Sequence, residues 1–94
     1  MLKITVQQSI EEVTIKLEGR IAGPWVEELR RTWASLVPSL GSKPLCVDLC
    51  GVTFVDLAGK HLLESVWKKG ARFLADTQMT KHLVEEIERG EGTP

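Results

Sequence analysis

Apolar and polar residues alternate along the first part of the chain. The alternating apolar positions are Leu2, Ile4 and Val6, followed by Val13, Ile15 and Leu17. A period of two residues is typical of a strand with one buried face. The pattern therefore predicts two strands, joined by a turn at Gln7–Glu12.

From Pro24 the apolar spacing lengthens to that of a helix. The residues that recur at helical intervals, and are expected to face the core, are Trp25, Leu29, Trp33 and Leu36. Trp25 lies in the first turn and is the tryptophan with most scope to be half exposed. Gly23 and Pro24 suit a helix start, because proline is tolerated in a first turn. The segment Pro38–Pro44 contains two prolines and a glycine, so it is predicted to be a loop.

A third strand is predicted from Leu45 onward, where the apolar pattern becomes almost continuous. Leu45–Cys50 is almost continuously apolar, which predicts a central strand covered on both faces. Its single acid, Asp48, is expected to form a hydrogen bond near Asp56 at the end of the strand. An amphipathic helix follows, ended by Gly70. Its apolar face is expected to consist of Leu62, Leu63, Val66 and Trp67, and its polar face of His61, Glu64, Ser65, Lys68 and Lys69.

The last elements are a short strand and a helix. The strand is predicted at Arg72–Ala75 and the helix at Thr77–Arg89. The helix residues expected to point inward are Met79, Leu83, Val84 and Ile87. Residues 91–94 are expected to form a flexible tail.

The order of elements is therefore β-β-α-β-α-β-α, an α/β fold in a single small domain at residues 1–90. A chain of 94 residues has room for one core only. Strand–helix–strand crossovers make the later strands parallel. We expect a mixed sheet of about four strands, with the first strand antiparallel, and three helices.

Composition narrows the possible partners. With 12 basic and 13 acidic residues the net charge is −1, which gives no single-sign field for nucleic acid or an anionic bilayer. The chain shows no signal-peptide pattern and no apolar run near the roughly 20 residues that span a membrane. The expected protein is cytoplasmic, binds no nucleic acid and does not insert into a membrane.

The sequence offers little chemistry for catalysis. Cys46 and Cys50 would lie about 13 Å apart on one strand, at about 3.3 Å per residue, which is too far for a disulfide. We expect both to be buried, inert thiols. His61 and His82 fall on different helices, and no metal-ligand spacing, nucleophile–base set or phosphate-binding glycine loop is present. The prediction is a non-enzymatic protein without metal or cofactor.

Two segments resemble the motifs of STAS domains, the family of bacterial anti-sigma factor antagonists. They are Leu17-Glu18-Gly19-Arg20-Ile21 and Val47–Gly59, the second of which ends in Val55-Asp56-Leu57-Ala58-Gly59. The resemblance implies a STAS fold and a role in transcription regulation through protein–protein interaction. In the family, the second segment opens a helix and meets a kinase or an anti-sigma factor.

The resemblance also implies a degenerate phosphorylation site. The family sequence at this point is Asp-Ser-Ser-Gly, and one serine receives the phosphate. Here Leu57 and Ala58 replace both serines, and Ala58 occupies the acceptor position. The chain would then remain competent for its partner. Thr53 and Ser65 are the nearest hydroxyls.

By the same resemblance the partner-binding residues are Arg20, Asp56, Leu57, Ala58, Gly59, Lys60 and His61. For Asp56, helix capping and partner contact both remain open. Lys60 lies in the first turn of the second helix, where a positive charge opposes the helix dipole. Either Lys60, together with His61, faces an acidic patch on a partner or an anion at the helix end, or Asp56 neutralises Lys60 at the surface.

Two other functions remain open. One is a STAS subunit that docks on the ATPase of a phospholipid-transport ABC complex. The other is a small-molecule or nucleotide sensor that uses the N-terminus of the second helix as an anion site. The expected oligomeric state is a monomer or a weak homodimer.

Overall fold

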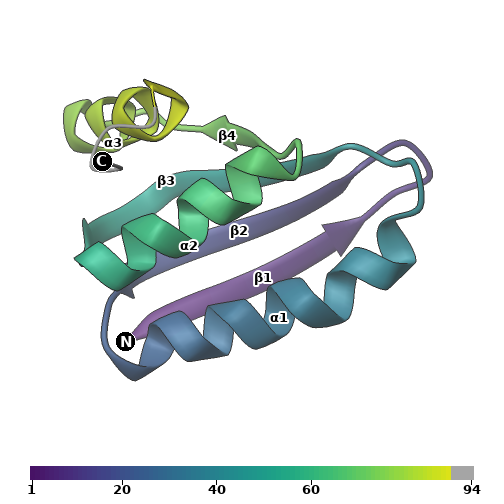
Figure 1. Cartoon of the computed structure of the whole chain (residues 1–94), viewed down its shortest axis with the longest axis horizontal. Helices are drawn as coiled ribbons and strands as arrows, with labels where there is room; N and C mark the ends of the chain where they lie inside the picture. The colour runs from purple at the N-terminus through teal and green to yellow at the C-terminus, as the bar shows by residue number, and fades with distance from the viewer. Residues whose placement is uncertain (90–94) are drawn as a thin grey trace.

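Figure 1 shows the computed structural model, which describes residues 1–89. Its elements are β1 (Leu2–Gln8), β2 (Val13–Ile21), α1 (Pro24–Leu40), β3 (Leu45–Val55), α2 (Leu57–Lys68), β4 (Arg72–Leu74) and α3 (Gln78–Arg89). This is the predicted order of elements. The predicted tail at residues 91–94, and the last residue of the predicted domain, lie outside the described residues.

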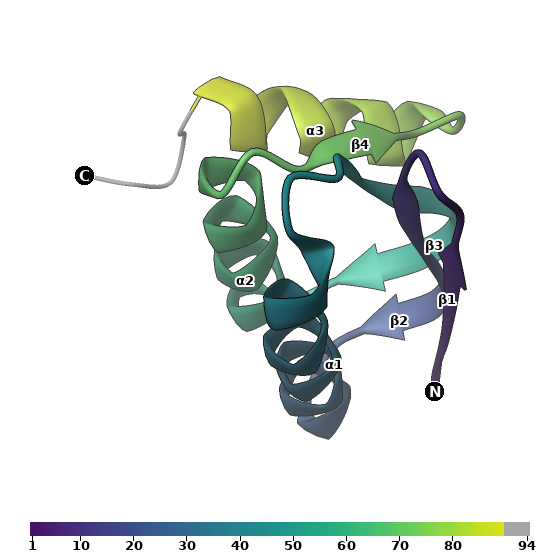
Figure 2. The same cartoon turned by 90° about the vertical axis from the view of Figure 1, so that its right-hand side faces the viewer.

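The strands form a four-stranded mixed sheet in the order β1-β2-β3-β4. β1 is antiparallel to β2, whereas β3 is parallel to both of its neighbours, β2 and β4, as predicted. Figure 2 shows α1 and α2 side by side on one face of the sheet and α3 beyond them at the β4 edge. In the described part of the chain, the opposite face of the sheet has no helix over it.

The prediction that β3 is covered on both faces is therefore wrong. Alternate residues of β3, including Val47 and Leu49, are buried beneath the helices. The residues between them, Cys46, Asp48 and Cys50, lie on the open face and are half-buried. The continuous apolar appearance of this strand arises because small thiol side chains, rather than charged ones, occupy two of its outward positions.

One apolar core lies between the sheet and the helices. Leu29, Leu63, Val66 and Leu83 are buried in it, as predicted, and Trp33 and Trp67 pack against it while remaining half-buried. The fully buried large side chains of the sheet are Val13, Ile15, Leu17, Ile21 and Leu49. The core is thus formed by the buried side chains of the parallel strands on one side and by those of the helices on the other.

In two helices the first buried residue differs from the predicted inward face, whereas Leu29, Leu36, Leu83 and Ile87 are buried as predicted. Val26 is buried in α1, and Trp25 is 36% exposed, which agrees with the partial exposure expected for its place in the first turn. In α3, Thr80 is buried and Met79 is 41% exposed. The hydroxyls of Thr80 and Thr77 lie 2.7 Å apart, and the Thr80 amide donates to the Thr77 hydroxyl, so Thr80 can be buried with its polar atoms satisfied.

Glu64 of α2, predicted on the polar face, is buried. Glu64 lies one helical turn after Lys60, and this side of α2 faces α3. The packing of α3 against α2 therefore covers a position that the sequence pattern places in solvent.

Several elements are longer than predicted. β1 continues to Gln8, so the first two residues of the predicted turn belong to the strand. α1 continues through Pro38 to Leu40, because Leu36 is buried and Leu40 packs against the core, which stabilises the last turn despite the missing amide. β3 continues to Val55, which pairs with Ile21 at the end of β2. The ends of β2 and β3 therefore lie level with one another, next to the starts of α1 and α2.

The first prediction concerns the core. Leu63→Ala should lower the free energy of unfolding by about 2–5 kcal/mol, because the Leu63 side chain is 1% exposed and its truncation leaves a cavity. Leu57→Ala in the same helix is the matched control, since Leu57 is 67% exposed, and should change stability by about 0.5 kcal/mol or less. Urea unfolding followed by tryptophan fluorescence measures both. Equal losses for the two variants would contradict the described core.

Candidate functional site

The candidate site lies at the end of the sheet where β3 enters α2. Asp56 is the single residue between the two elements. Its backbone amide donates a hydrogen bond of 3.1 Å to the carbonyl of Ile21, the last residue of β2. The β3–α2 junction is thus bonded directly to the start of the β2–α1 connection.

The Asp56 side chain joins the two helix starts. Its Oδ1 accepts a hydrogen bond of 2.7 Å from the Gly59 amide, which caps α2. Its Oδ2 accepts one of 3.0 Å from the amide of Gly23, the N-cap residue of α1. The hydrogen bond from the Gly23 amide, and to a smaller extent the one from the Gly59 amide, lowers the pKa of Asp56, because both bonds favour the charged form of the carboxyl group. The capping interpretation is confirmed, and contact with a partner stays a prediction.

Gly59 allows α2 to lie against the end of β2. A Cβ atom at this position would lie 2.7 Å from the Ile21 carbonyl oxygen and 2.9 Å from the Ile21 side chain. Neither atom belongs to the free end of a long side chain, so neither can move aside easily. Among the predicted site residues, Gly59 is therefore buried structure and not contact surface.

The residues around Gly59 point outward. Leu57, Ala58 and His61 are all exposed. The first turn of α2 contains no acidic residue, and no hydroxyl occupies either position between Asp56 and Gly59. The nearest hydroxyls are engaged with the backbone: Thr53 donates to the Gly19 carbonyl and Ser65 to the His61 carbonyl, each at 3.2 Å.

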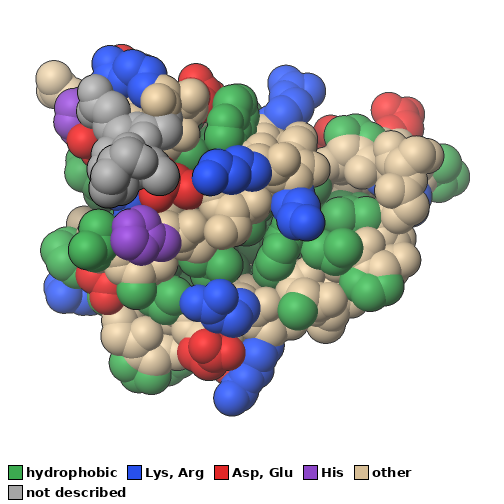
Figure 3. All heavy atoms as spheres, in the orientation of Figure 1, with side chains coloured by type: hydrophobic (Ala, Val, Ile, Leu, Met, Phe, Trp, Pro, Cys, Tyr) green, Lys and Arg blue, Asp and Glu red, His purple; other side chains and the backbone are tan. Residues whose placement is uncertain are grey.

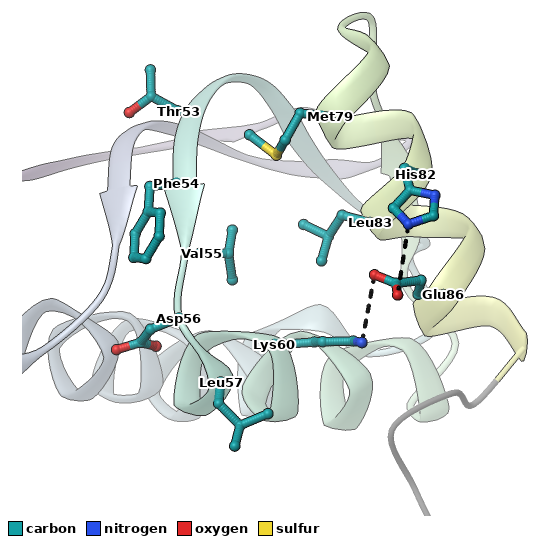
Figure 4. A pocket seen from close by; sticks show the side chains of 10 residues that line it. All are labelled: Thr53, Phe54, Val55, Asp56, Leu57, Lys60, Met79, His82, Leu83 and Glu86. Carbon is teal, nitrogen blue, oxygen red and sulfur yellow. Dashed lines mark ion pairs between the residues drawn. The ribbon is translucent and has the colours of Figure 1, made fainter.

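Lys60 turns toward α3 instead of toward Asp56. Its Nζ lies 3.5 Å from Oε1 of Glu86, and the other oxygen of Glu86 lies 3.7 Å from Nε2 of His82 (Figure 4). The prediction that Asp56 neutralises Lys60 is wrong, because Asp56 uses both carboxylate oxygens on backbone amides. The charge of Lys60 at the start of α2 is compensated by Glu86, which lies 26 residues further along the chain.

Arg20 approaches the same end of the sheet from β2. Its guanidinium carbon lies 4.6 Å from the centre of the Phe54 ring, a cation–π contact. The sequence-predicted site residues of β2 and α2 are thus brought to one end of the molecule. Figure 3 shows hydrophobic, acidic and basic side chains gathered at that left-hand end, where α1 and α2 begin.

The sequence did not predict a groove that borders this surface. It has a volume of about 390 Å³ and separates the β3–α2 junction from α3. Its apolar lining comes from Phe54, Val55, Leu57, Met79 and Leu83 (Figure 4). The groove exists only because α3 packs beside the β3–α2 junction. Met79 could have indicated this apolar surface, but the sequence analysis expected it to point into the core.

The two cysteines lie away from this surface, on the open face of β3. Both are free and half-buried, so the prediction of full burial is wrong. The Asp48 carboxylate, followed by burial and Asp76, raises the pKa of Cys50 to about 11, which keeps this thiol protonated at neutral pH. Asp48 accepts a hydrogen bond of 2.9 Å from the Cys50 amide. It does not approach Asp56, because a strand rises about 3.3 Å per residue and most of β3 separates them.

Within residues 1–89, no group of three or more His, Cys, Asp or Glu side chains is arranged to hold a metal ion. None of the described helices combines the length and the apolar character needed to cross a membrane.

Known structures share the fold. An anti-sigma factor antagonist from Mycobacterium paratuberculosis matches with a TM-score of 0.78 and 18% identity, over 100% of this chain and 84% of that one. SpoIIAA, an anti-sigma factor antagonist in its unphosphorylated form, gives a TM-score of 0.55 and 17% identity, over 96% and 99% of the two chains. A DUF3478 protein from Shewanella loihica with a SpoIIAA-like fold gives 0.57 and 11%, over 84% and 70%.

At the level of sequence, no family model matches the chain and no characterised protein matches it significantly. The structural likeness, at 18% identity or less in these three comparisons, shows the fold. The chain has the STAS fold of the anti-sigma factor antagonists, as its sequence motifs predicted.

The second prediction concerns Asp56. Asp56→Ala should destabilise the protein more than Asp56→Asn, because asparagine can still cap a helix. The Asp56 pKa is lower in the folded state, so the stabilisation from its charge is fully present above the unfolded-state pKa and is lost as pH falls through the folded one. The difference in unfolding free energy between wild type and Asp56→Asn should therefore shrink below about pH 4.

Chemical denaturation from neutral to acidic pH provides the measurement for both Asp56 variants. A difference that stays constant, or grows, as pH falls would contradict the described role of the carboxylate.

Proposed function

We propose that this chain is a non-enzymatic protein–protein interaction module of the anti-sigma factor antagonist type that cannot be switched off at its helix-start loop. The observation that carries the proposal is the exposed Leu57–Ala58 pair at the N-terminus of α2, in a fold shared with anti-sigma factor antagonists. The proposed contact residues are Arg20, Asp56, Leu57, Ala58, Lys60 and His61, with Gly59 setting the position of the helix.

The surface around this pair supports a protein partner. Leu57 exposes most of its side chain, and Trp25, in the first turn of α1, is also exposed. Leu57 also borders a groove with the exposed apolar residues Phe54 and Met79, and exposed apolar residues that gather on one surface are typical of interaction sites. The hydrogen bonds of Asp56 hold the starts of α1 and α2 together. A partner would therefore meet a surface that is already ordered, which lowers the entropic cost of binding.

The proposed lack of a switch follows from the side chains at the start of α2. Phosphorylation of a hydroxyl at position 58 would add a charge of about −1.5 to −2, which the helix N-terminus tolerates and an apolar contact does not. Ala58 has no hydroxyl to accept a phosphate. The hydroxyls of Thr53 and Ser65 are hydrogen-bonded to the backbone and lie outside the first turn. We infer that the chain stays in its partner-competent form.

The third prediction tests this surface with a charge. Ala58→Glu should leave stability nearly unchanged, because Ala58 is exposed and an acid in a first turn is favourable by about 0.3–1 kcal/mol. It should nevertheless weaken partner binding by a few kcal/mol, on the order of 1–3, because the carboxylate would be desolvated without a partner. Ala34→Glu is the matched control, since Ala34 is exposed in the middle of α1.

The partner itself is identified by affinity capture from the source cell, with wild type, Ala58→Glu and Ala34→Glu as parallel baits and mass spectrometry as readout. We expect an anti-sigma factor or its kinase to be enriched by wild type and Ala34→Glu but not by Ala58→Glu. Enrichment of an ABC ATPase instead would favour the transport-subunit function and contradict the proposal. Equal capture by all three baits would show that the start of α2 is not the binding surface.

A fourth prediction concerns the missing acceptor. Incubated with the recovered kinase and ATP, the wild-type protein should incorporate no phosphate. The Ala58→Ser variant has a hydroxyl in the position that the resemblance assigns to the acceptor, and it should incorporate a single phosphate. Intact-mass spectrometry detects a single phosphate. Stoichiometric phosphate on Thr53 or Ser65 of the wild type would overturn the proposal that the chain has no switch.

A further inference from the structure

The groove between the β3–α2 junction and α3 lies directly beside the proposed contact residues. Leu57 and Lys60 belong to both. Figure 4 shows the Val55 side chain pointing toward Leu83 of α3, with Met79 above this gap and Lys60 and Glu86 below it. The groove is therefore a continuation of the surface at the start of α2 and not a separate cavity.

We propose that this groove receives one large apolar side chain of the protein partner, and that a carboxylate next to that side chain binds Arg20. This inference deepens the proposed function and rests on it. It names the chemistry of the partner segment: an apolar anchor flanked by an acidic residue.

The apolar part of the inference follows from exposure. Phe54, Leu57 and Met79 are 42%, 67% and 41% exposed, and all three border this one groove. Val55 and the buried Leu83 also line it. With about 390 Å³, the groove has room for a large side chain, whose burial would remove apolar surface from water on both sides of the contact.

The polar groups of the groove argue for an apolar anchor rather than a polar small molecule. Lys60 and Glu86 already pair with each other, and His82 shares the same carboxylate. Asp56 already accepts from two backbone amides. A small-molecule site usually offers unpaired polar groups that orient its ligand. Within residues 1–89, the groove lining provides no buried side-chain polar atom without a hydrogen-bond partner.

The acidic part of the inference follows from Arg20. Its guanidinium lies over the Phe54 ring at the edge of the groove. Among the formal charges at this edge, Asp56, Lys60 and Glu86 are engaged, whereas Arg20 forms no ion pair with any described residue. The contact with the ring involves no oxygen acceptor, and the N–H donors of a guanidinium match a carboxylate in a two-bond geometry.

Peptide probes test the proposed chemistry directly. The first is a short blocked peptide with one phenylalanine followed by two glutamates. Two matched peptides replace the phenylalanine by alanine or the glutamates by lysines. In an NMR titration of the full ¹⁵N-labelled chain, the first peptide should shift the amide signals of Val55, Leu57, Met79 and Leu83. Each matched peptide should bind at least tenfold more weakly.

Variants of the chain place the binding site. Met79→Lys puts an ammonium at the edge of the groove and should weaken the first peptide at least tenfold. Val37→Lys is the control, because Val37 is 42% exposed on α1 and lies outside the groove, and it should bind as wild type. Arg20→Glu should reverse the preference, so that the lysine peptide binds more tightly than the glutamate peptide. Shifts confined to another surface, no binding in the millimolar range, or equal binding by Met79→Lys would overturn the proposal.

The same variants separate this inference from the proposed function. If Ala58→Glu loses the captured partner and Met79→Lys keeps it at full affinity, the groove inference fails and the proposed function stands. If both variants keep the partner, both fail. Loss of the partner in both, with Val37→Lys unaffected, is the result expected here.

Discussion

The first turn of α2 can lie against the end of β2 because position 59 has no side chain. A Cβ there would meet the Ile21 carbonyl oxygen at 2.7 Å, and the Asp56 amide already donates to that same oxygen. This close backbone approach fixes where α2 begins. The Asp56 carboxylate then extends the constraint to α1 through the Gly23 amide. The exposed positions of the candidate site, Leu57 and Ala58, follow from this geometry because Gly59 must face inward.

The packing of the helices explains why this end of the molecule is ordered at all. The sheet is covered on one face in the described part of the chain, so the core depends on how α1, α2 and α3 lie over it. α3 is held beside α2 partly by the ion pair between Lys60 and Glu86. A lysine in a first turn opposes the helix dipole, and a half-buried carboxylate facing it offsets that cost. The same contact closes one side of the groove.

The sequence was sufficient for the order of elements, the sheet topology and the capping of α2 by Asp56. These features depend on the periodicity of apolar residues and on helix capping by Asp56, and both involve residues that are close together in the sequence. It was not sufficient for the exact inward face of a helix. Trp25 and Val26 both fit a helical spacing to Leu29, as Met79 and Thr80 both fit one to Leu83. The choice is made by how each helix docks and by the Thr77–Thr80 hydrogen bonds, which a period alone does not reveal.

Contacts between distant segments were also beyond the sequence. Nothing in the pattern around Lys60 indicates Glu86, because their contact exists only when α3 packs against α2. The groove has the same origin, since one of its walls is β3 and the other is α3. Pro38 illustrates the opposite case: its local signal to end a helix is strong, yet burial of Leu36 and packing of Leu40 outweigh one lost hydrogen bond.

The geometry at the start of α2 also weighs between the proposed functions. Anion sensing at a helix N-terminus requires free backbone amides. Here the Asp56 carboxylate already binds the Gly59 amide at 2.7 Å and bears its own negative charge at that end of the helix. An incoming phosphate or carboxylate could reach the Gly59 amide only by displacing this carboxylate oxygen, while the second oxygen is bound to the Gly23 amide. The nearby ammonium of Lys60 is paired with Glu86. One amide at the start of this helix is thus already bound within the fold, and what the site offers outward is its exposed apolar side chains.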